Sequence, residues 1–176
     1  DIQEVLFSRT EIENRVAELG KVLSRDYEGL NPLCICILKG AIVFTADLIR
    51  EMDIPLQIDV IAVSSYGNST SSSGVVRILK DLETSVENRH VLVIEDIVDT
   101  GLTLRYLVDL LRRRDPASLK VVSFLDKPSR RKVEIQADYC GFSIPDHFVV
   151  GYGFDCAQKY RNLPYIGVLN EKVYSS

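Results

Sequence analysis

Three acidic side chains, Glu95, Asp96 and Asp99, follow closely after a run of four apolar residues in this sequence. Two adjacent carboxylates repel a bare anion, but they suit a divalent cation, which takes oxygen ligands, or the hydroxyl groups of a sugar. An aspartate before a threonine is also a common helix N-cap, and that structural alternative stays open for Asp99. The alternative explains one acid and leaves the pair Glu95–Asp96 without a role. The chemistry expected here is therefore cation or sugar binding.

The residues after the acids have the composition of a phosphate-binding turn. They are Thr100, Gly101, Leu102 and Thr103. A helical spacing of apolar residues begins at Leu104, so the turn lies at the N-terminus of a helix. The first amides of a helix have no acceptor within the helix and carry partial positive charge, and threonine hydroxyls add donors. A phosphate monoester fits such a turn.

The elements around this turn place it at one edge of a buried sheet. Residues 91–94 are apolar without alternation and mostly β-branched, which is typical of a strand buried on both faces of a parallel sheet. The apolar spacing predicts a helix over 103–113. In an open α/β sheet, ligands bind at the carboxyl ends of the strands, where the acids and the turn lie.

The segment 95–103, which reads Glu-Asp-Ile-Val-Asp-Thr-Gly-Leu-Thr, resembles the motif that binds 5-phosphoribosyl 1-pyrophosphate (PRPP) in type I phosphoribosyltransferases, and specifically their hypoxanthine-guanine branch. Further motifs of that branch follow in the family's order over nearly all of the chain. The resemblance implies one α/β domain over 1–176 with the type I phosphoribosyltransferase fold. In that fold a mostly parallel central sheet is flanked by helices, with a small hood built from both termini and a flexible lid loop.

The resemblance also implies a reaction. The 5-phosphoribosyl group of PRPP is transferred to N9 of a 6-oxopurine, hypoxanthine or guanine, which gives IMP or GMP and pyrophosphate in purine salvage, with Mg²⁺ as cofactor. Glu95 and Asp96 are expected to anchor the ribose hydroxyls, directly or through Mg²⁺. Asp99 is expected to act as the catalytic base at purine N7, and the loop from Asp99 to Thr103 to hold the 5′-phosphate.

A second apolar strand, predicted over 33–38, ends in Lys39 and Gly40 before a predicted helix over 41–49. Taken alone, a surface lysine and a turn glycine explain these two residues equally well. The family's pyrophosphate loop has the same Leu-Lys-Gly sequence, often with a cis peptide before the lysine. The resemblance therefore assigns pyrophosphate to Lys39 and Gly40, and to Arg161, whose planar guanidinium suits a pair of oxygens.

Purine binding is expected from segments near the C-terminus. Lys127 follows a predicted strand, where an exposed lysine is the structural alternative, and it matches the family lysine that donates to the purine 6-oxo group. The resemblance implies that Phe148 stacks on the purine and that Val149 meets the edge of the base through its backbone. It places Asp155 close by, as a ligand to a second Mg²⁺ or to water near pyrophosphate. The basic residues 130–132 are predicted to form a solvated loop.

A polar, serine-rich segment lies between predicted strands over 58–63 and 75–79. A disordered linker is one interpretation. A long excursion between two strands of one domain is more often a lid, and the resemblance also indicates a lid over about 64–75. Ser65 and Tyr66 are then expected to close over the site and exclude water.

The remaining patterns predict ordinary structural elements. An amphipathic helix is expected over 9–25, with Thr10 as its cap and Glu13 closing a capping box. A further strand is expected over 119–125. No internal repeat or linker divides the chain.

The composition narrows the class of protein. The chain has 21 basic and 25 acidic residues, a net charge of −4, which argues against a general nucleic-acid binder. No apolar run reaches the length of a membrane span, and no secretory signal is visible, so we expect no membrane partner and a cytoplasmic location. The four cysteines lack the spacing of a zinc set, which favours free thiols.

Two alternative functions remain at this point. A PRPP-binding regulator of nucleic acid needs a basic face or a helix-turn-helix, and neither is evident in this sequence. A phosphoribosyltransferase for another base, such as adenine or a pyrimidine, conflicts with Lys127 and Phe148, which favour 6-oxopurines. A homodimer or homotetramer is expected, with PRPP and the purine base as small-molecule partners.

Overall fold

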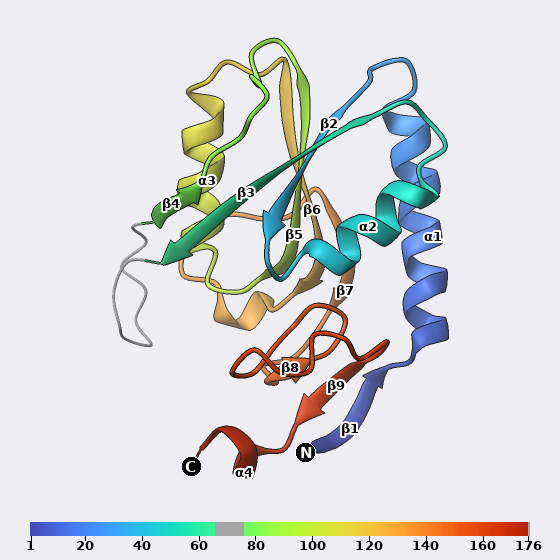
Figure 1. Cartoon of the computed structure of the whole chain (residues 1–176), viewed down its shortest axis with the longest axis vertical. Coiled ribbons are helices and arrows are strands. Elements are labelled where there is room, and N and C mark those ends of the chain that lie inside the picture. Colours follow the sequence, from blue (N-terminus) through green and yellow to red (C-terminus); the bar gives the residue numbers. More distant parts are fainter. Residues whose placement is uncertain (66–75, 176) are drawn as a thin grey trace.

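The computed structural model describes residues 1–65 and 76–175, and over these residues the chain builds a central sheet of six strands (Figure 1). The strand order is β4-β3-β2-β5-β6-β7, and the pairing is parallel except between β3 and β4. The strands are β2 (Leu33–Leu38), β3 (Gln57–Ser65), β4 (Val76–Lys80), β5 (His90–Val98), β6 (Ser118–Asp126) and β7 (Tyr139–Ser143). The sheet is the mostly parallel one that the sequence predicts.

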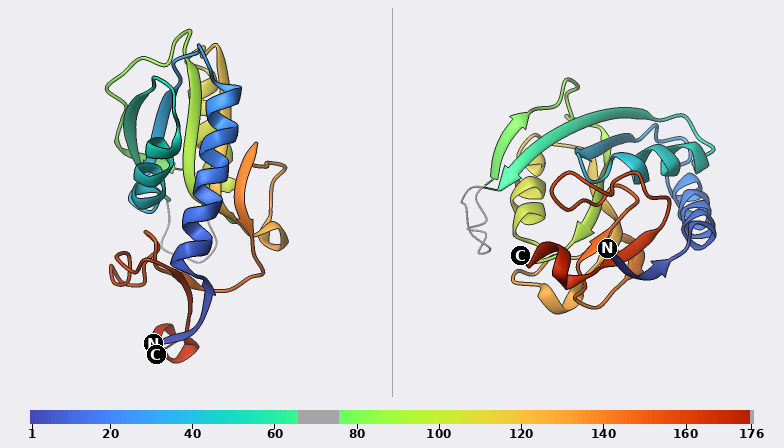
Figure 2. Two further views of the ribbon diagram at one scale, coloured as in Figure 1. Left: turned by 90° about the vertical axis from the view of Figure 1, so that its right-hand side faces the viewer. Right: turned by 60° about the horizontal axis from the view of Figure 1, so that its bottom comes forward.

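Helices cover both faces of this sheet (Figures 1 and 2). The helices are α1 (Arg9–Asp26), α2 (Ile42–Glu51), α3 (Leu102–Arg112), the short 3-10 helix η1 (Pro128–Arg130) and α4 (Glu171–Tyr174). Side chains of α1 and α2 pack with Leu92 and Ile94, and side chains of α3 pack with Val91 and Val93. Because β5 is buried on both faces, its sequence is apolar without alternation, as predicted.

A second, three-stranded sheet joins the two ends of the chain. It consists of β1 (Ile2–Phe7), β9 (Ile166–Leu169) and β8 (Val149–Val150), in the order β1-β9-β8. Both pairs are antiparallel, and Ile2 lies opposite Leu169. This sheet lies beyond the carboxyl ends of β2 and β5, so it faces the edge where ligand binding is expected (Figure 1).

Helix α1 begins at a different cap from the one predicted. The hydroxyl of Ser8 accepts a hydrogen bond from the Glu11 amide, and the Glu11 carboxylate accepts one from the Ser8 amide, both at 3.1 Å. The prediction of a cap at Thr10 with Glu13 was therefore wrong by two residues. Ser8 has extended backbone angles, whereas Thr10 already lies within the helix.

Strand β5 is longer than its apolar run. The sequence predicted that the strand ends at Ile94, but β5 continues to Val98 because β6 remains paired with it, with Glu95 opposite Ser123 and Ile97 opposite Leu125. Glu95 and Asp96 therefore stand on the strand, and only Asp99 to Gly101 form the turn.

The lid predicted over about 64–75 lies mostly outside the described residues, and Tyr66 with it, while Ser65 is the last residue of β3. A membrane span is not found: in the part of the chain that the structure describes, no helix combines the length and the apolar character that crossing a bilayer requires.

Asp59 on β3 organises the connection between β4 and β5. It is 8% exposed, and its carboxylate accepts hydrogen bonds from the amides of Val60, Glu83 and Thr84 at 2.8, 3.0 and 2.8 Å. Burial acts to raise the pKa of Asp59, but these backbone hydrogen bonds outweigh it, so the pKa lies below its usual value. The ionised side chain thus holds the loop that leads into the central strand.

We expect the substitution Asp59→Ala to lower the free energy of unfolding by about 1–3 kcal/mol at neutral pH, because it leaves buried amides unpaired. The carboxyl of the unfolded chain titrates near pH ~3.9, and the folded chain has the lower pKa. The difference in unfolding free energy between the unmodified protein and Asp59→Ala is therefore largest above about pH 5. It shrinks as the pH falls through the pKa that Asp59 has in the folded chain. Urea unfolding at pH values near 7 and near 3 measures it. The exposed Asp53→Ala is the control, and an equal loss at both pH values contradicts the argument.

Candidate active site

The two central strands separate at their carboxyl ends. Beyond β2 the chain turns through α2 to β3 on one side, and beyond β5 it turns through α3 to β6 on the other. The pairing of β2 with β5 ends at Cys36 opposite Ile94, while both strands continue past this pair. A crevice opens between diverging connections of this kind, which is where ligands bind in open α/β sheets.

Glu95 and Asp96 stand at the mouth of this crevice. Glu95 is 9% exposed, and its carboxylate accepts a hydrogen bond from the Asp96 amide at 3.0 Å. Burial raises the pKa of Glu95 well above its usual value, and the neighbouring charge of Asp96 adds to the effect. Burial also raises the pKa of Asp96. Two buried carboxylates of raised pKa need a nearby cation in order to stay ionised, so the pair fits a divalent metal.

Backbone atoms surround this pair closely. A Cβ on Gly40 would overlap the Asp96 carboxylate, and a Cβ on Gly153 would overlap the Gly40 carbonyl oxygen. The peptide bond between Leu38 and Lys39 is cis, which the sequence left open although the family's loop often has this bond, and the Lys39 side chain is exposed. The structure thus brings the Lys39-Gly40 segment against the acids, although the two lie more than fifty residues apart.

The turn after β5 forms the N-terminus of α3. Gly101 occupies the N-cap position with φ +85°, a left-handed conformation that glycine adopts without strain, and it contributes no side-chain cap. The Thr100 hydroxyl accepts from the Leu102 amide at 3.4 Å. The turn and the acids line one cavity of about 260 Å³. Its lining includes Leu38, Gly40, Glu95, Asp96, Asp99, Thr100, Gly101 and Thr103.

The chain supplies only part of a metal coordination shell. Among the described residues, no three Asp, Glu, His or Cys side chains lie close enough together to hold an ion. The pair Glu95–Asp96 therefore offers two carboxylates, which suits Mg²⁺, since this ion usually keeps several waters and takes oxygens from its substrate. Asp155 does not join the pair: its carboxylate lies 3.3 Å from the Arg161 guanidinium and accepts from the Gln158 amide at 2.9 Å.

Arg161 lies close enough to Asp96 to act on it electrostatically. Burial raises the pKa of Asp96, and the positive charge of Arg161 partly offsets that increase. The guanidinium donates to the Gly153 carbonyl at 2.7 Å and to the Gln158 side chain at 3.2 Å. Its Nε is buried and has no hydrogen-bond partner among the described residues. This nitrogen therefore lacks a hydrogen bond, and an oxygen of a ligand can reach it only when the Arg161 side chain moves.

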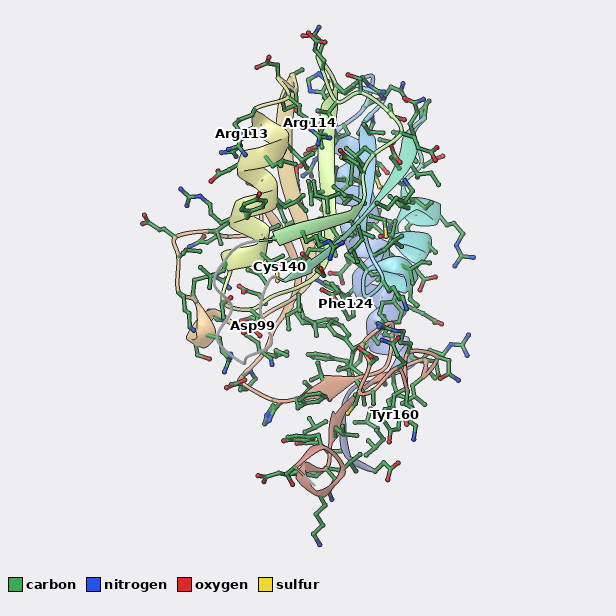
Figure 3. All side chains as sticks on the ribbon, turned by 60° about the vertical axis from the view of Figure 1, so that its left-hand side comes forward. Asp99, Arg113, Arg114, Phe124, Cys140 and Tyr160 are labelled. Atoms are coloured by element: carbon green, nitrogen blue, oxygen red, sulfur yellow. The ribbon has the colours of Figure 1, made fainter. Side chains whose placement is uncertain are left out.

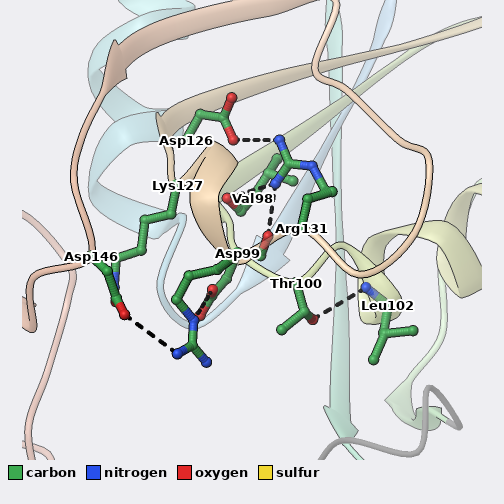
Figure 4. A network of polar contacts seen from close by, with 9 residues as sticks. Val98, Asp99, Thr100, Leu102, Asp126, Lys127, Arg131 and Asp146 are labelled. Carbon is green, nitrogen blue, oxygen red and sulfur yellow. Dashed lines mark hydrogen bonds and ion pairs between the residues drawn. The ribbon is translucent and has the colours of Figure 1, made fainter.

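Asp99 belongs to a polar network that the sequence did not predict (Figure 4). The Nε of Arg130 donates to the Asp99 carboxylate at 2.8 Å, and the same guanidinium lies 3.5 Å from Asp146. Lys127, which is 9% exposed, lies 3.5 Å from the other oxygen of Asp146. The alternative of a freely exposed Lys127 is therefore wrong. Figure 3 places Asp99 at the end of the main sheet that faces the second sheet.

Arg131 binds the backbone of the turn that follows β5. Its guanidinium donates to the backbone carbonyls of Val98 and Asp99 at 3.2 and 2.7 Å and to the Asp126 carboxylate at 2.5 Å (Figure 4). The Lys132 amide donates to the Thr100 carbonyl at 2.8 Å. The prediction of a solvated loop over residues 130–132 therefore agrees with the exposure of Arg130 and Lys132 but was wrong for Arg131. The available signal was their position directly after β6, whose carboxyl end lies beside that of β5.

The residues expected at the purine lie on the second sheet and just before it. The Phe148 ring is 40% exposed, whereas the adjacent Val149 is buried in β8. Because successive residues of an extended chain point to opposite sides, Phe148 presents its ring outward while Val149 anchors the segment. A larger groove of about 690 Å³ lies between α1, α2 and residues 161–164. Neither Glu95 and Asp96 nor the turn before α3 contributes to its lining.

Known proteins resemble this chain over its full length. Residues 5–157 match the family model described as phosphoribosyl transferase domain. The chain is 58% identical to the hypoxanthine-guanine phosphoribosyltransferase of Bacillus subtilis strain 168, across all of this chain and 98% of that protein. It is 50% identical to the enzyme of the same name from Streptococcus thermophilus CNRZ 1066, across 99% and 97%. The crystal structure of a hypoxanthine phosphoribosyltransferase from Staphylococcus aureus has a TM-score of 0.98 and 51% identity, covering 100% of this chain and 96% of that one.

We expect the substitution Arg131→Ala to lower the free energy of unfolding by about 1–3 kcal/mol, because it leaves the Asp126 carboxylate and the Asp99 carbonyl without their donor, while the Val98 carbonyl keeps the Lys127 amide. Thermal and urea unfolding measure this loss. The control is Arg9→Ala, which removes an exposed ion pair with Glu13 and is expected to cost less than about 0.5 kcal/mol. Equal stability of the two variants contradicts a structural role for Arg131.

Proposed function

The chain belongs to the phosphoribosyl transferase family, and from this premise we propose that it transfers the 5-phosphoribosyl group of PRPP to N9 of hypoxanthine or guanine. The products are IMP or GMP and pyrophosphate. The relatives that match nearly the whole chain carry the name hypoxanthine-guanine phosphoribosyltransferase, which supports this choice of base. Lys127 and Phe148 stand where a 6-oxopurine needs a donor and a flat apolar partner.

One observation carries the proposal. The buried Glu95, the half-buried Asp96 and the N-terminus of α3, where Gly101 supplies no side-chain cap, line the same small cavity at the point where β2 and β5 separate. A ligand for this cavity must combine a phosphate, which the helix amides favour, with a sugar or a metal, which the acids favour. PRPP with Mg²⁺ meets both requirements in one molecule.

The groups of PRPP are assigned to the cavity in order. The 5′-phosphate binds the turn from Asp99 to Thr103, and the ribose hydroxyls bind Glu95 and Asp96. The pyrophosphate lies beside Lys39 and Gly40, and it can reach the unpartnered Nε of Arg161 when that side chain moves. Glu95 and Asp96 would hold Mg²⁺, which would supply positive charge that stabilises the leaving pyrophosphate.

Bond changes occur at C1′ of the ribose. The bond from C1′ to the pyrophosphate oxygen breaks, N9 of the purine forms the new bond to C1′, and Asp99 accepts the proton of N7 or holds N7 by a hydrogen bond. Positive charge builds on the ribose ring as pyrophosphate leaves, so positioning and electrostatics provide most of the catalysis. Arg130 already pairs with one oxygen of Asp99, and the second oxygen remains to meet N7.

Oligomeric state and location are also part of the proposal. We expect a homodimer or homotetramer, and two features support this: the exposed Ile42 on α2, and a groove between α1 and α2 whose lining mixes apolar and charged side chains. Sedimentation over a range of protein concentrations measures the assembly. The four cysteines are free, as in proteins of reducing compartments, which supports a cytoplasmic location.

The proposed function is tested by pyrophosphate release. We expect the protein with PRPP and Mg²⁺ to release pyrophosphate when hypoxanthine or guanine is added, and far less with adenine or uracil. Removal of Mg²⁺ by a chelator should abolish release. Calorimetry with PRPP and Mg²⁺ tests the binding step alone. Turnover of adenine or uracil in preference would indicate a transferase for another base, and PRPP binding without any turnover would indicate a regulator.

We expect Asp99→Asn to lower kcat by about 10²–10⁴-fold, the range of a general-base contribution, because an amide cannot take the N7 proton. Steady-state kinetics at saturating PRPP and hypoxanthine measure the change. The control is Asp109→Asn on α3, which alters an exposed acid and should leave turnover unchanged. If Asp99→Asn turns over at the unmodified rate, the base role must be dropped.

A further inference from the structure

The last helix of the chain places an aromatic ring against Phe148. The rings of Phe148 and Tyr174 are stacked, with centroids 4.6 Å apart and an angle of 15° between their planes. Helix α4, which carries Tyr174, is tied to the second sheet. The Leu169 amide donates to the Phe148 carbonyl at 2.9 Å, and the Asn170 side chain caps α4 by accepting from the Lys172 amide at 3.1 Å. Tyr174 is thus held in place at the end of an anchored segment.

Only one face of the Phe148 ring is covered by this contact. Phe148 remains 40% exposed although Tyr174 stacks on its ring, so part of the residue stays accessible to a ligand. Figures 1 and 2 place α4 on the side of the second sheet that points away from the six-stranded sheet. Tyr174 belongs to α4, so its ring contacts Phe148 from the side of that helix.

We propose that Tyr174 is a positioning residue for the purine base: it supports Phe148 from behind, so that the base, Phe148 and Tyr174 form a stack of three rings. The inference rests on the proposed function, in which Phe148 stacks on the purine. An exposed phenylalanine without support samples several rotamers and loses that freedom when a ligand binds. The stacked Tyr174 ring fixes Phe148 before the base arrives, and offset or parallel aromatic pairs are favourable in themselves.

This role predicts an effect on one substrate only. Support of Phe148 strengthens binding of the flat base and leaves the contacts of PRPP with Glu95, Asp96 and the α3 turn untouched, because those residues belong to the main sheet and the helix that follows it. We expect Tyr174→Leu, which keeps an apolar side chain but removes the ring, to raise KM for hypoxanthine and for guanine about threefold to tenfold, equivalent to about 0.6–1.4 kcal/mol. KM for PRPP and kcat should stay unchanged.

Two variants serve as controls. Tyr174→Phe keeps the ring and should retain the purine KM of the unmodified protein, since the stack needs no hydroxyl. Lys172→Ala changes an exposed residue of the same helix and should also be silent. Sedimentation of every variant checks that the assembly state is unchanged, and urea unfolding checks the fold.

The possible results separate the inference from the proposed function. A purine KM that is unchanged in Tyr174→Leu overturns the inference, and so does a lower KM, because Tyr174 would then compete with the base for Phe148. Equal changes in the KM of PRPP and of the purine would mean that the tail acts on the whole site, and they overturn it too. If the unmodified protein shows no purine-dependent release of pyrophosphate, the proposed function fails first and the inference falls with it.

Discussion

Burial of two neighbouring carboxylates is the constraint on which the rest of this molecule depends. Glu95 and Asp96 stand where β2 and β5 separate, and burial raises the pKa of both. Charges in such surroundings are stable only when a cation or hydrogen-bond donors compensate them. The chain provides a backbone amide for each carboxylate, from Asp96 to Glu95 and from Ile97 to Asp96, and it places Arg161 near Asp96. Further compensation comes from what enters the cavity. The site is therefore built to be completed by its ligand, and a metal with a phosphorylated sugar is the ligand that these groups suit.

Close packing of the neighbouring backbone fixes the position of Glu95 and Asp96. Asp96, Gly40 and Gly153 come from three distant parts of the chain, and side chains on the two glycines would overlap their neighbours. The contact ties the edge of the main sheet to the segment that follows β8. Positions of this kind tolerate almost no substitution, because the adjacent backbone and the buried acid cannot move aside cheaply.

Two adjacent arginines after β6 have different physical roles. Arg131 is mostly buried and bonds to backbone carbonyls of the turn as well as to Asp126, so it contributes to the shape of the phosphate loop. Arg130 is 42% exposed and pairs with the equally exposed Asp99. An exposed pair is weak and exchanges readily, so Asp99 can change partner when a substrate binds. Arg131 thus supports the backbone of the loop, whereas Arg130 contacts the carboxylate of Asp99.

Much of this protein could be predicted from the sequence, because local rules determine those parts. The continuous apolar run of β5 indicated a parallel sheet, which the structure has, because a strand buried on both faces is apolar without alternation. The acids after this run and the Thr-Gly-Leu-Thr turn predicted a phosphate site at a helix N-terminus, and helix α3 does begin there. The bounds of β5, the cap at Ser8 and the roles of Arg130 and Arg131 were decided by tertiary structure. The length of β5 depends on pairing with β6, the start of α1 on which residue caps it, and the roles of the two arginines on a loop from another strand. Apolar periodicity does not encode such partners. The stacking of Tyr174 on Phe148 has the same origin, because only the pairing of the two chain ends brings the last helix to that ring.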